Sequence, residues 1–175
     1  MNFKQKLNDI KAFIFDVDGV LSPNTIPLDS NGVPQRMSNV KDGYSINLAN
    51  RLGYIIGIIT GGKEEAVRLR FENLGLNPAD IYLAQSDKVA AYEDIKARYG
   101  LDDSQIIYMG DDIPDLKVME RVGVPVCPAD AAPEVQEISI YVSNIAGGHG
   151  CARDIIEQTL RAQNNWMSHP DAYTW

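Results

Sequence analysis

The chain has 175 residues, enough for one domain with a buried core, and its 45% hydrophobic and 23% charged residues are typical of a globular protein. A net charge of −8 argues against general affinity for nucleic acid, because lysine and arginine must neutralise phosphates. The sequence shows no apolar run of the roughly 18 to 20 residues that cross a bilayer, so we expect a cytoplasmic protein with no membrane partner. Cys127 and Cys151 lack a metal-ligand spacing, which argues against a zinc site or a disulfide framework.

Short apolar runs alternate with helical patterns along the chain. The runs predict buried strands at 10–15, 55–60, 81–84, 106–110 and 124–127. Apolar residues at helical spacing predict helices within 67–74, 89–99 and 152–160. Alternation of this kind predicts an α/β fold, a Rossmann-like parallel sheet with helices on both faces. Such sheets bind ligands just beyond the carboxyl ends of their strands.

The segment 21–40 interrupts this alternation. It carries Pro23, Pro27, Asn31-Gly32 and Pro34 among short extended pieces. These residues predict a small β-hairpin flap directly after the first strand, with an ordinary surface loop as the alternative. We expect one domain over 1–164 without a large cap domain, and a C-terminal tail over 165–175 whose weak periodicity predicts no element.

Two acids follow the first strand. Asp16 and Asp18 flank Val17 and precede Gly19, so both carboxylates leave the sheet at a tight turn. The pattern Asp-x-Asp-Gly also occurs in calcium loops, but such a loop continues with further oxygen ligands, whereas here Val20-Leu21 follows. The pair is therefore a candidate for chemistry at the edge of the sheet.

Polar residues also follow the second and third strands. Thr60-Gly61-Gly62 offers a hydroxyl group and bare backbone amides that can hold phosphate oxygens, although a plain strand-to-helix turn explains the glycines equally well. Lys88 begins a helix beside Asp87, and a lone lysine in such a place is usually a solvated surface residue. Either feature indicates a functional site only in combination with the acids.

A cluster of acids follows the fourth strand. Asp111, Asp112 and Asp115 fall within five consecutive positions. A helix cap can use one carboxylate, but it does not explain three. Because neighbouring like charges repel, the cluster indicates a divalent cation or a lysine among these acids.

In this order the four groups of residues resemble the four motifs of the haloacid dehalogenase superfamily of phosphohydrolases. The motifs are Asp16-Val-Asp-Gly, Thr60-Gly, Lys88 and Gly110-Asp-Asp-x-x-Asp115, and they extend over nearly the whole chain. The resemblance implies a single hydrolase domain, a phosphoric monoester hydrolase activity and Mg²⁺ as the cofactor. Four motifs in the right order make a specific signal.

Two further segments resemble a small subfamily, the 3-deoxy-D-manno-octulosonate 8-phosphate phosphatases. They are Asn39-Val-Lys-Asp-Gly after the flap and Ala146-Gly-Gly-His-Gly-Cys-Ala-Arg-Asp154. This resemblance implies a homotetramer that acts in lipopolysaccharide biosynthesis. Relatives that act on nine-carbon sugar phosphates tend to carry glutamate after the Thr-Gly pair, whereas this chain has Gly62, which favours the eight-carbon substrate.

The resemblance also implies roles for the acids. Asp16 would attack phosphorus to form an aspartyl phosphate, and Asp18 would act as general acid and then as general base. The side chains of Asp16 and Asp111 and the backbone carbonyl of Asp18 would bind Mg²⁺. Asp112 would hold a water molecule of the magnesium shell, and Asp115 is expected beside the catalytic lysine.

The remaining motif residues would bind the substrate. Thr60, Gly61 and Lys88 would contact the transferring phosphate oxygens, with the ammonium group of Lys88 fixed by an acid. By the same resemblance, the segment Gly147-Gly148-His149-Gly150 with Arg153 would cover the substrate of a neighbouring subunit. A flexible turn before the last helix is the alternative explanation of these glycines.

Other functions stay open at this point. A signalling receiver domain also surrounds a phosphorylated aspartate with acids, a threonine and a lysine, but receivers place the phosphoacceptor after an earlier acidic pair. A fold retained only for binding is a second rival. Within the enzymes, a phosphatase for a nine-carbon ketoacid phosphate or for another sugar phosphate is the alternative, because selectivity lies in pocket shape rather than in shared machinery.

Overall fold

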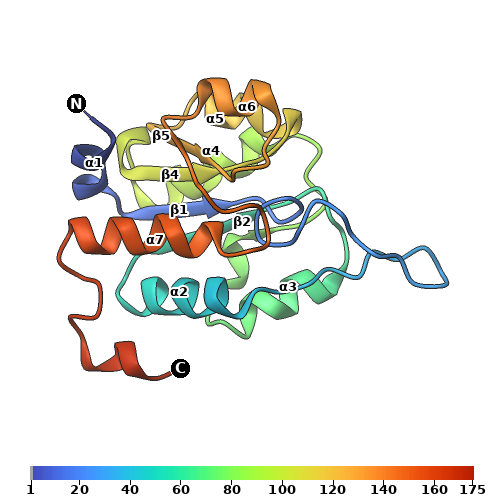
Figure 1. Ribbon diagram of the computed structural model, residues 1–175, viewed down its shortest axis with the longest axis horizontal. Coiled ribbons are helices and arrows are strands. Elements are labelled where there is room, and N and C mark those ends of the chain that lie inside the picture. Colours follow the sequence, from blue (N-terminus) through green and yellow to red (C-terminus); the bar gives the residue numbers. More distant parts are fainter. Residues whose placement is uncertain (1) are drawn as a thin grey trace.

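A six-stranded parallel sheet forms the centre of the computed structural model, which describes residues 2–175 (Figure 1). The strand order is β3-β2-β1-β4-β5-β6. All five neighbouring pairs are parallel, with Phe15 of β1 opposite Ile58 of β2 and Met109 of β4. The strands are Ala12–Phe15 (β1), Ile55–Ile59 (β2), Ile81–Tyr82 (β3), Ile106–Met109 (β4), Val124–Cys127 (β5) and Tyr141–Val142 (β6).

The predicted α/β fold is confirmed, because parallel strands alternate with helices along the chain. Successive strands are added on both sides of β1. Strands β2 and β3 lie on one side of β1, and β4, β5 and β6 lie on the other. The order therefore reverses between β1 and β4, and a ligand is expected in the crevice at their carboxyl ends. The five predicted strands are present, the first four slightly shorter than predicted and the fifth with the predicted bounds. The sixth, β6, has two residues and no pattern that could be recognised in the sequence.

Helices cover both faces of the sheet, as predicted (Figure 1). One face carries α2 (Val40–Arg51), α3 (Glu65–Glu72) and α7 (Cys151–Ala162), and the other carries α4 (Lys88–Tyr99), α5 (Leu116–Met119) and α6 (Pro133–Ile138). A short α1 (Phe3–Lys6) precedes the sheet. Single 3₁₀ turns occupy Leu7–Asp9, Pro78–Asp80, Asp103–Gln105, Ile113–Asp115 and Pro170–Tyr173.

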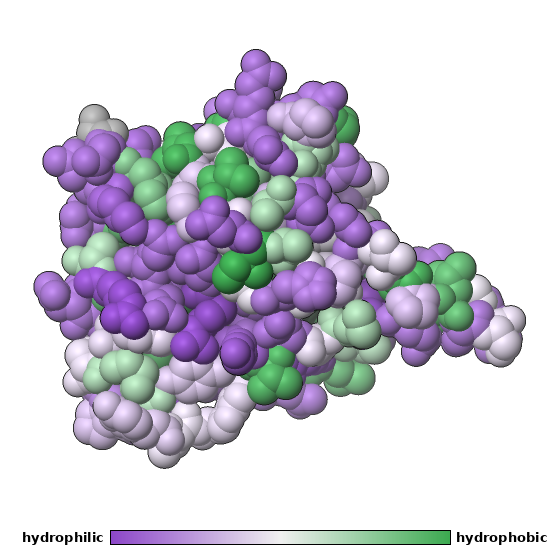
Figure 2. Space-filling view, viewed as in Figure 1, coloured by the Kyte–Doolittle hydropathy of each residue, from purple (hydrophilic) through white to green (hydrophobic). Residues whose placement is uncertain are grey.

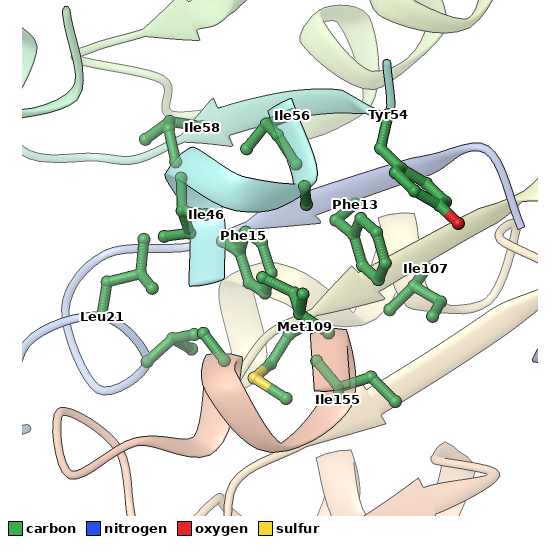
Figure 3. Packing of buried hydrophobic residues seen from close by; sticks show 14 of the residues in the cluster. Phe13, Phe15, Leu21, Ile46, Tyr54, Ile56, Ile58, Ile107, Met109 and Ile155 are labelled. Atoms are coloured by element: carbon green, nitrogen blue, oxygen red, sulfur yellow. The ribbon is translucent and has the colours of Figure 1, made fainter. Parts of the chain in front are cut away.

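Alternating side chains of β1 divide the core into two layers. Phe13 and Phe15 enter the layer under α2 and α7, while Ala12 and Ile14 enter the layer under α4. Figure 3 shows Phe13 and Phe15 side by side among the residues of the first layer, with Ile155 of α7 close by. Burial on both faces explains why β1 is an unbroken apolar run.

Local capping residues fix where two site-bearing helices begin. The side chain of Asn39 accepts hydrogen bonds from the backbone N–H groups of Lys41 and Asp42 at the start of α2. The carboxylate of Asp87 accepts one from the Val89 N–H group at 3.0 Å and so starts α4 at Lys88. Each cap satisfies an amide that the helix itself leaves unpaired.

The predicted flap is present but contains little regular structure. One antiparallel bridge joins Leu28 to Pro34, and the Asp29 carboxylate accepts hydrogen bonds from the N–H groups of Asn31 and Val33 to close the turn. Figures 1 and 2 show this segment projecting from the body of the molecule. The flap is one residue shorter than predicted, because Val40 begins α2. Within residues 2–175 the chain carries no large cap domain.

The segment 165–175 lies against α2. Tyr44 donates a hydrogen bond to the carbonyl of Ala172, and Arg51 Nη2 donates one to the carbonyl of Thr174 at 3.0 Å. The division of the chain at residue 164 stays a prediction. Among residues 2–175 the longest helices have 12 residues, and none is long and apolar enough to cross a membrane.

Candidate active site

A cavity of about 420 Å³ opens at the carboxyl ends of β1, β2 and β4. Asp16 follows β1, Thr60 follows β2, Asp111 lies two residues after β4, and Lys88 begins α4. Eight of the nine predicted site residues line this cavity, and Arg153 does not. The lining residues are Asp16, Asp18, Asn24, Thr60, Gly61, Gly62, Gln85, Ser86, Lys88, Asp111, Asp112, Pro114 and Asp115.

Lys88 is a buried cation between two carboxylates. Its Nζ atom lies 2.9 Å from Asp16 Oδ1 and 2.7 Å from Asp115 Oδ1. Burial alone would lower the pKa of Lys88, but the charges of Asp16 and Asp115 raise it, so the ammonium form is held at neutral pH. The role expected for Asp115, fixing this ammonium group, is therefore compatible with the structure.

Asp115 is fully engaged by the protein. Its Oδ1 atom also accepts a hydrogen bond from the Tyr108 hydroxyl group at 2.6 Å, and its Oδ2 atom accepts one from the Asp111 N–H group at 3.0 Å. Tyr108 lies on β4, where an apolar run predicts an ordinary core residue, so no sequence pattern indicates this contact. With both oxygens occupied, Asp115 is poorly placed to be a metal ligand.

Asp16 and Asp111 have the properties of metal ligands. Carboxylate oxygens of Asp16, Asp111 and Asp115 lie within 4.8 Å of one another. Among residues 2–175 no group hydrogen-bonds the buried Oδ1 atom of Asp111. Such an orphaned buried oxygen is costly unless a cation meets it.

The charge balance of this cluster supports the same conclusion. Burial, followed by repulsion from Asp115, raises the pKa of Asp16 to about 7. Burial, followed by repulsion from Asp16, raises the pKa of Asp111 to about 8. One lysine does not neutralise three close carboxylates, whereas Mg²⁺ readily takes one or two of them together with phosphate oxygens. The residues present therefore fit Mg²⁺, with Asp16 and Asp111 as its side-chain ligands.

Gly19 makes room for one of these ligands. Its φ angle of +87° lies in the left-handed region that favours glycine, and a Cβ atom there would overlap the Asp111 carboxylate. The glycine of the first motif therefore has a steric function at the site. It lets the loop after β1 pass directly over Asp111.

Thr60 and Asp112 are each oriented by a backbone contact. Thr60 is buried, and its Oγ1 atom accepts a hydrogen bond from the Gly62 N–H group at 3.1 Å. The hydroxyl hydrogen thus stays available for a phosphate oxygen. Asp112 accepts a hydrogen bond from the Ile113 N–H group at 2.8 Å, so it caps the following turn and also lines the cavity.

Arg153 lies away from this cavity in its own chain. Its Nε atom is 3.1 Å from Glu157 Oε2, and its guanidinium group lies 4.7 Å from the ring centre of Trp166. The segment around Gly147 packs on the loop after β1 of its own chain, because a Cβ atom at Gly147 would overlap the Gly19 carbonyl. A substrate contact by Arg153 in a neighbouring subunit stays a prediction.

Arg36 is a further residue beside the site that the sequence did not reveal. Its guanidinium group reaches from the flap to the carboxylate of Asp18 and to Glu64 before α3. Nothing in the flap sequence distinguishes this arginine from a solvated one. Its partners are distant in sequence and meet it only in the folded chain.

Comparison with known proteins identifies the class to which this site belongs. The sequence pattern of the haloacid dehalogenase-like hydrolases matches residues 61–155. The chain belongs to the haloacid dehalogenase-like hydrolases. The resemblance predicted from the four motifs is thereby confirmed, and the chain is a hydrolase rather than a receiver domain.

Within this class, the relatives point to one particular phosphatase. The 3-deoxy-D-manno-octulosonate 8-phosphate phosphatases of Salmonella typhi and Escherichia coli K12 are each 39% identical over 158 residues, which cover 90% of this chain and 83% of theirs. The structure of the Yersinia pestis phosphatase of the same name has a TM-score of 0.90 at 34% identity, covering 94% of this chain and 88% of that one.

A further solved structure bears on the ligands. The 3-deoxy-D-manno-octulosonate 8-phosphate phosphatase of Moraxella catarrhalis, in complex with a magnesium ion, a phosphate ion and a KDO molecule, has a TM-score of 0.90 at 32% identity. The similarity covers 98% of this chain and 97% of that one. The magnesium ion of that relative is the kind of cation that Asp16 and Asp111 fit in this chain.

Proposed function

We propose that this chain is a Mg²⁺-dependent phosphatase that hydrolyses 3-deoxy-D-manno-octulosonate 8-phosphate to the free sugar acid and phosphate. One observation carries the reaction class. Lys88 holds Asp16 at the carboxyl end of β1, beside an Asp111 oxygen that accepts no hydrogen bond from residues 2–175. The likeness to phosphatases of this name over nearly the whole chain supports the substrate.

The first step would transfer the phosphoryl group to the enzyme. Asp16 attacks phosphorus, the bond from phosphorus to the sugar oxygen breaks, and Asp18 donates a proton to that oxygen. Mg²⁺, when bound by Asp16 and Asp111, offsets the repulsion between the carboxylate and the anionic ester. Lys88 and the hydroxyl group of Thr60 bind the transferring oxygens in this step.

The second step would release phosphate. A water molecule attacks the phosphorus of the aspartyl phosphate, its proton passes to Asp18, and the acyl phosphate bond breaks to return the Asp16 carboxylate. The backbone N–H group of Gly61 contributes to phosphate binding at the turn after β2. Asp112 holds a water molecule near the metal, and Asp115 keeps Lys88 in place.

A panel of phosphate esters tests this proposal. We expect the highest kcat/KM with the eight-carbon sugar acid phosphate, in buffer with Mg²⁺, and loss of activity in excess chelator. A higher value with a nine-carbon ketoacid phosphate or an ordinary sugar phosphate would establish one of the alternatives. A flat profile would leave only a nonspecific phosphatase, and the absence of turnover with every ester, including p-nitrophenyl phosphate, would remove the enzymatic function.

We also propose that the chain forms a homotetramer in the cytoplasm and acts in lipopolysaccharide biosynthesis. Leu28 and Met37 of the flap are 64% and 58% exposed, which supports contact between flaps. Both cysteines, Cys127 and Cys151, are buried free thiols, which fits a reducing compartment. Light scattering of the full chain tests the assembly, and a monomer mass at the concentrations used for turnover would contradict it.

A further inference from the structure

Arg36 joins three segments that are distant in sequence. Its Nε and Nη2 atoms lie 2.6 and 2.9 Å from the two carboxylate oxygens of Asp18, in the loop after β1. Its Nη1 atom lies 2.5 Å from Glu64 Oε2, at the start of α3. A forked contact to both oxygens fixes the plane of a carboxylate as well as its position.

The arrangement is enclosed rather than superficial. The side chain of Arg36 is 11% exposed and that of Glu64 19%, whereas Asp18 is 37% exposed and faces the cavity. Exposed ion pairs contribute little to stability. A guanidinium group shielded from solvent in this way, however, has few other positions to adopt. Glu64 holds the far side of the guanidinium group, so the fork is directed at Asp18.

Gly62 provides the space for this contact. A Cβ atom at Gly62 would lie 2.6 Å from Arg36 Nη2. A side chain at this position would therefore displace the guanidinium group. The glycine after the Thr60-Gly61 pair thus has a second function, since it admits a cation from the flap to the edge of the site.

Among residues 2–175, Arg36 is the side chain that orients Asp18. The other site acids have further contacts: Asp16 has Lys88, and Asp115 has both Lys88 and Tyr108. Without Arg36, the Asp18 carboxylate would rotate freely at the cavity edge. A misplacement of about 1 Å can reduce a reaction rate about a hundredfold.

We propose that Arg36 is a positioning residue, which holds the ionised Asp18 in the orientation to accept the proton of the attacking water and so links the flap to that step. This proposal rests on the acid and base role of Asp18 in the proposed function. It assigns to the flap a contribution to the chemical step, in addition to any cover it gives the substrate. The fork is the essential feature, because a lysine supplies the charge without fixing the carboxylate plane.

The test is a double-mutant cycle between Arg36→Ala and Asp18→Asn. Turnover of p-nitrophenyl phosphate is measured in a separate assay, because its good leaving group keeps the slow variants measurable. In the wild-type background we expect Arg36→Ala to lower kcat for the sugar acid phosphate at least about tenfold and to change KM less. In the Asp18→Asn background the same change should cost less than about threefold, since the carboxylate it positions is already gone. Arg36→Lys should recover only part of the loss, and added guanidinium ion should partly rescue Arg36→Ala.

Gln35→Ala is the matched control, because Gln35 neighbours Arg36 and its side-chain amide donates hydrogen bonds to the flap residues Asp29 and Val33 rather than to Asp18. It should leave kcat within about twofold of wild type. Equal factors for Arg36→Ala in the two backgrounds would overturn the proposal, as would an unchanged kcat. If Arg36→Ala lowers the melting temperature too far for assay, Arg36→Lys or Glu64→Gln takes its place in the cycle with Asp18→Asn. Failure of the phosphatase function itself is recognised separately, because the wild-type chain would then turn over no ester.

Discussion

Lys88 and Asp115 form an ion pair that is almost completely hidden from solvent, with 2.7 Å between Nζ and Oδ1 and side chains 5% and 1% exposed. The pair joins the first residue of α4 to the turn after β4. Because Asp16 lies on the other side of the same ammonium group, the contact that stabilises the fold also places the proposed nucleophile. Stability and activity are therefore expected to respond together when Lys88 is changed.

Lys88→Met should lower the free energy of unfolding by about 3 to 5 kcal/mol, since it leaves buried carboxylates without their cation. Turnover should fall to the background rate. Adding Asp115→Asn to Lys88→Met should restore part of the stability and none of the activity. Urea unfolding and turnover measure the two effects.

Lys96→Met is the control for that experiment. Lys96 makes an ion pair of similar length, 2.7 Å to Asp103, but the two side chains are 26% and 42% exposed. Its removal should cost less than about 1 kcal/mol and leave turnover unchanged. Similar losses for both lysines would show that burial is not the source of the difference.

Asp16→Asn should abolish turnover while the fold is kept. The substitution removes the proposed nucleophile and metal ligand but hardly alters side-chain volume. It also reduces repulsion within a cluster where burial raises the pKa of Asp16 to about 7. The melting temperature in the absence of Mg²⁺ should therefore equal or exceed that of the wild type. Activity within tenfold of the wild type, or phosphate trapped on another residue, would refute the nucleophile assignment.

Gly19→Ala should raise the Mg²⁺ concentration needed for half-maximal activity by at least about tenfold, because a Cβ atom there would push the Asp111 carboxylate away from its place. Calorimetry of Mg²⁺ binding provides a readout that does not depend on turnover. Asp111→Ala should show the same effect in a stronger form.

Gly53→Ala separates this steric effect from backbone strain. Gly53 has a similar φ angle of +91°, but no heavy atom of the described chain lies within 4 Å of its Cβ position. This variant should lose about 1 to 2 kcal/mol of stability and bind Mg²⁺ normally. Equal losses of Mg²⁺ affinity at both glycines would contradict the steric explanation.

The strands and the acids at their ends were predictable from the sequence. A strand buried on both faces is an unbroken apolar run, and here the runs end in polar residues. Helix α2 was not predicted, since its buried positions include Asp42, Gly43 and Ser45 and therefore lack an apolar stripe. The role of Arg36 could not be predicted either, because it depends on contacts with Asp18 and Glu64, which are distant in sequence. Contacts between segments, unlike strand ends, leave no local pattern.

Asp42 links the first turn of α2 to the start of α7, and this contact should make stability depend on pH. Its Oδ1 atom accepts a hydrogen bond from the Arg153 N–H group at 2.7 Å, while among residues 2–175 its buried Oδ2 atom has no partner. Burial outweighs the hydrogen bond and the positive charge of Arg153 and raises the pKa of Asp42 from 3.8 to about 6. The folded chain therefore binds a proton here at pH values where the unfolded chain has released it.

The sign of the effect follows from this difference. The contribution of Asp42 is fully present below the unfolded pKa of 3.8, declines as pH rises, and is lost above the folded pKa of about 6. A shift of this size corresponds to about 3 kcal/mol. Asp42→Asn imitates the protonated form at every pH, so the wild type should lose up to about 3 kcal/mol relative to this variant between pH 4 and pH 7. Urea unfolding of both proteins at several pH values, in the same Mg²⁺ concentration, measures that difference and cancels the titration of the site acids. Parallel curves for the two proteins would show that Asp42 is already ionised in the fold at low pH, with its second oxygen reached by water.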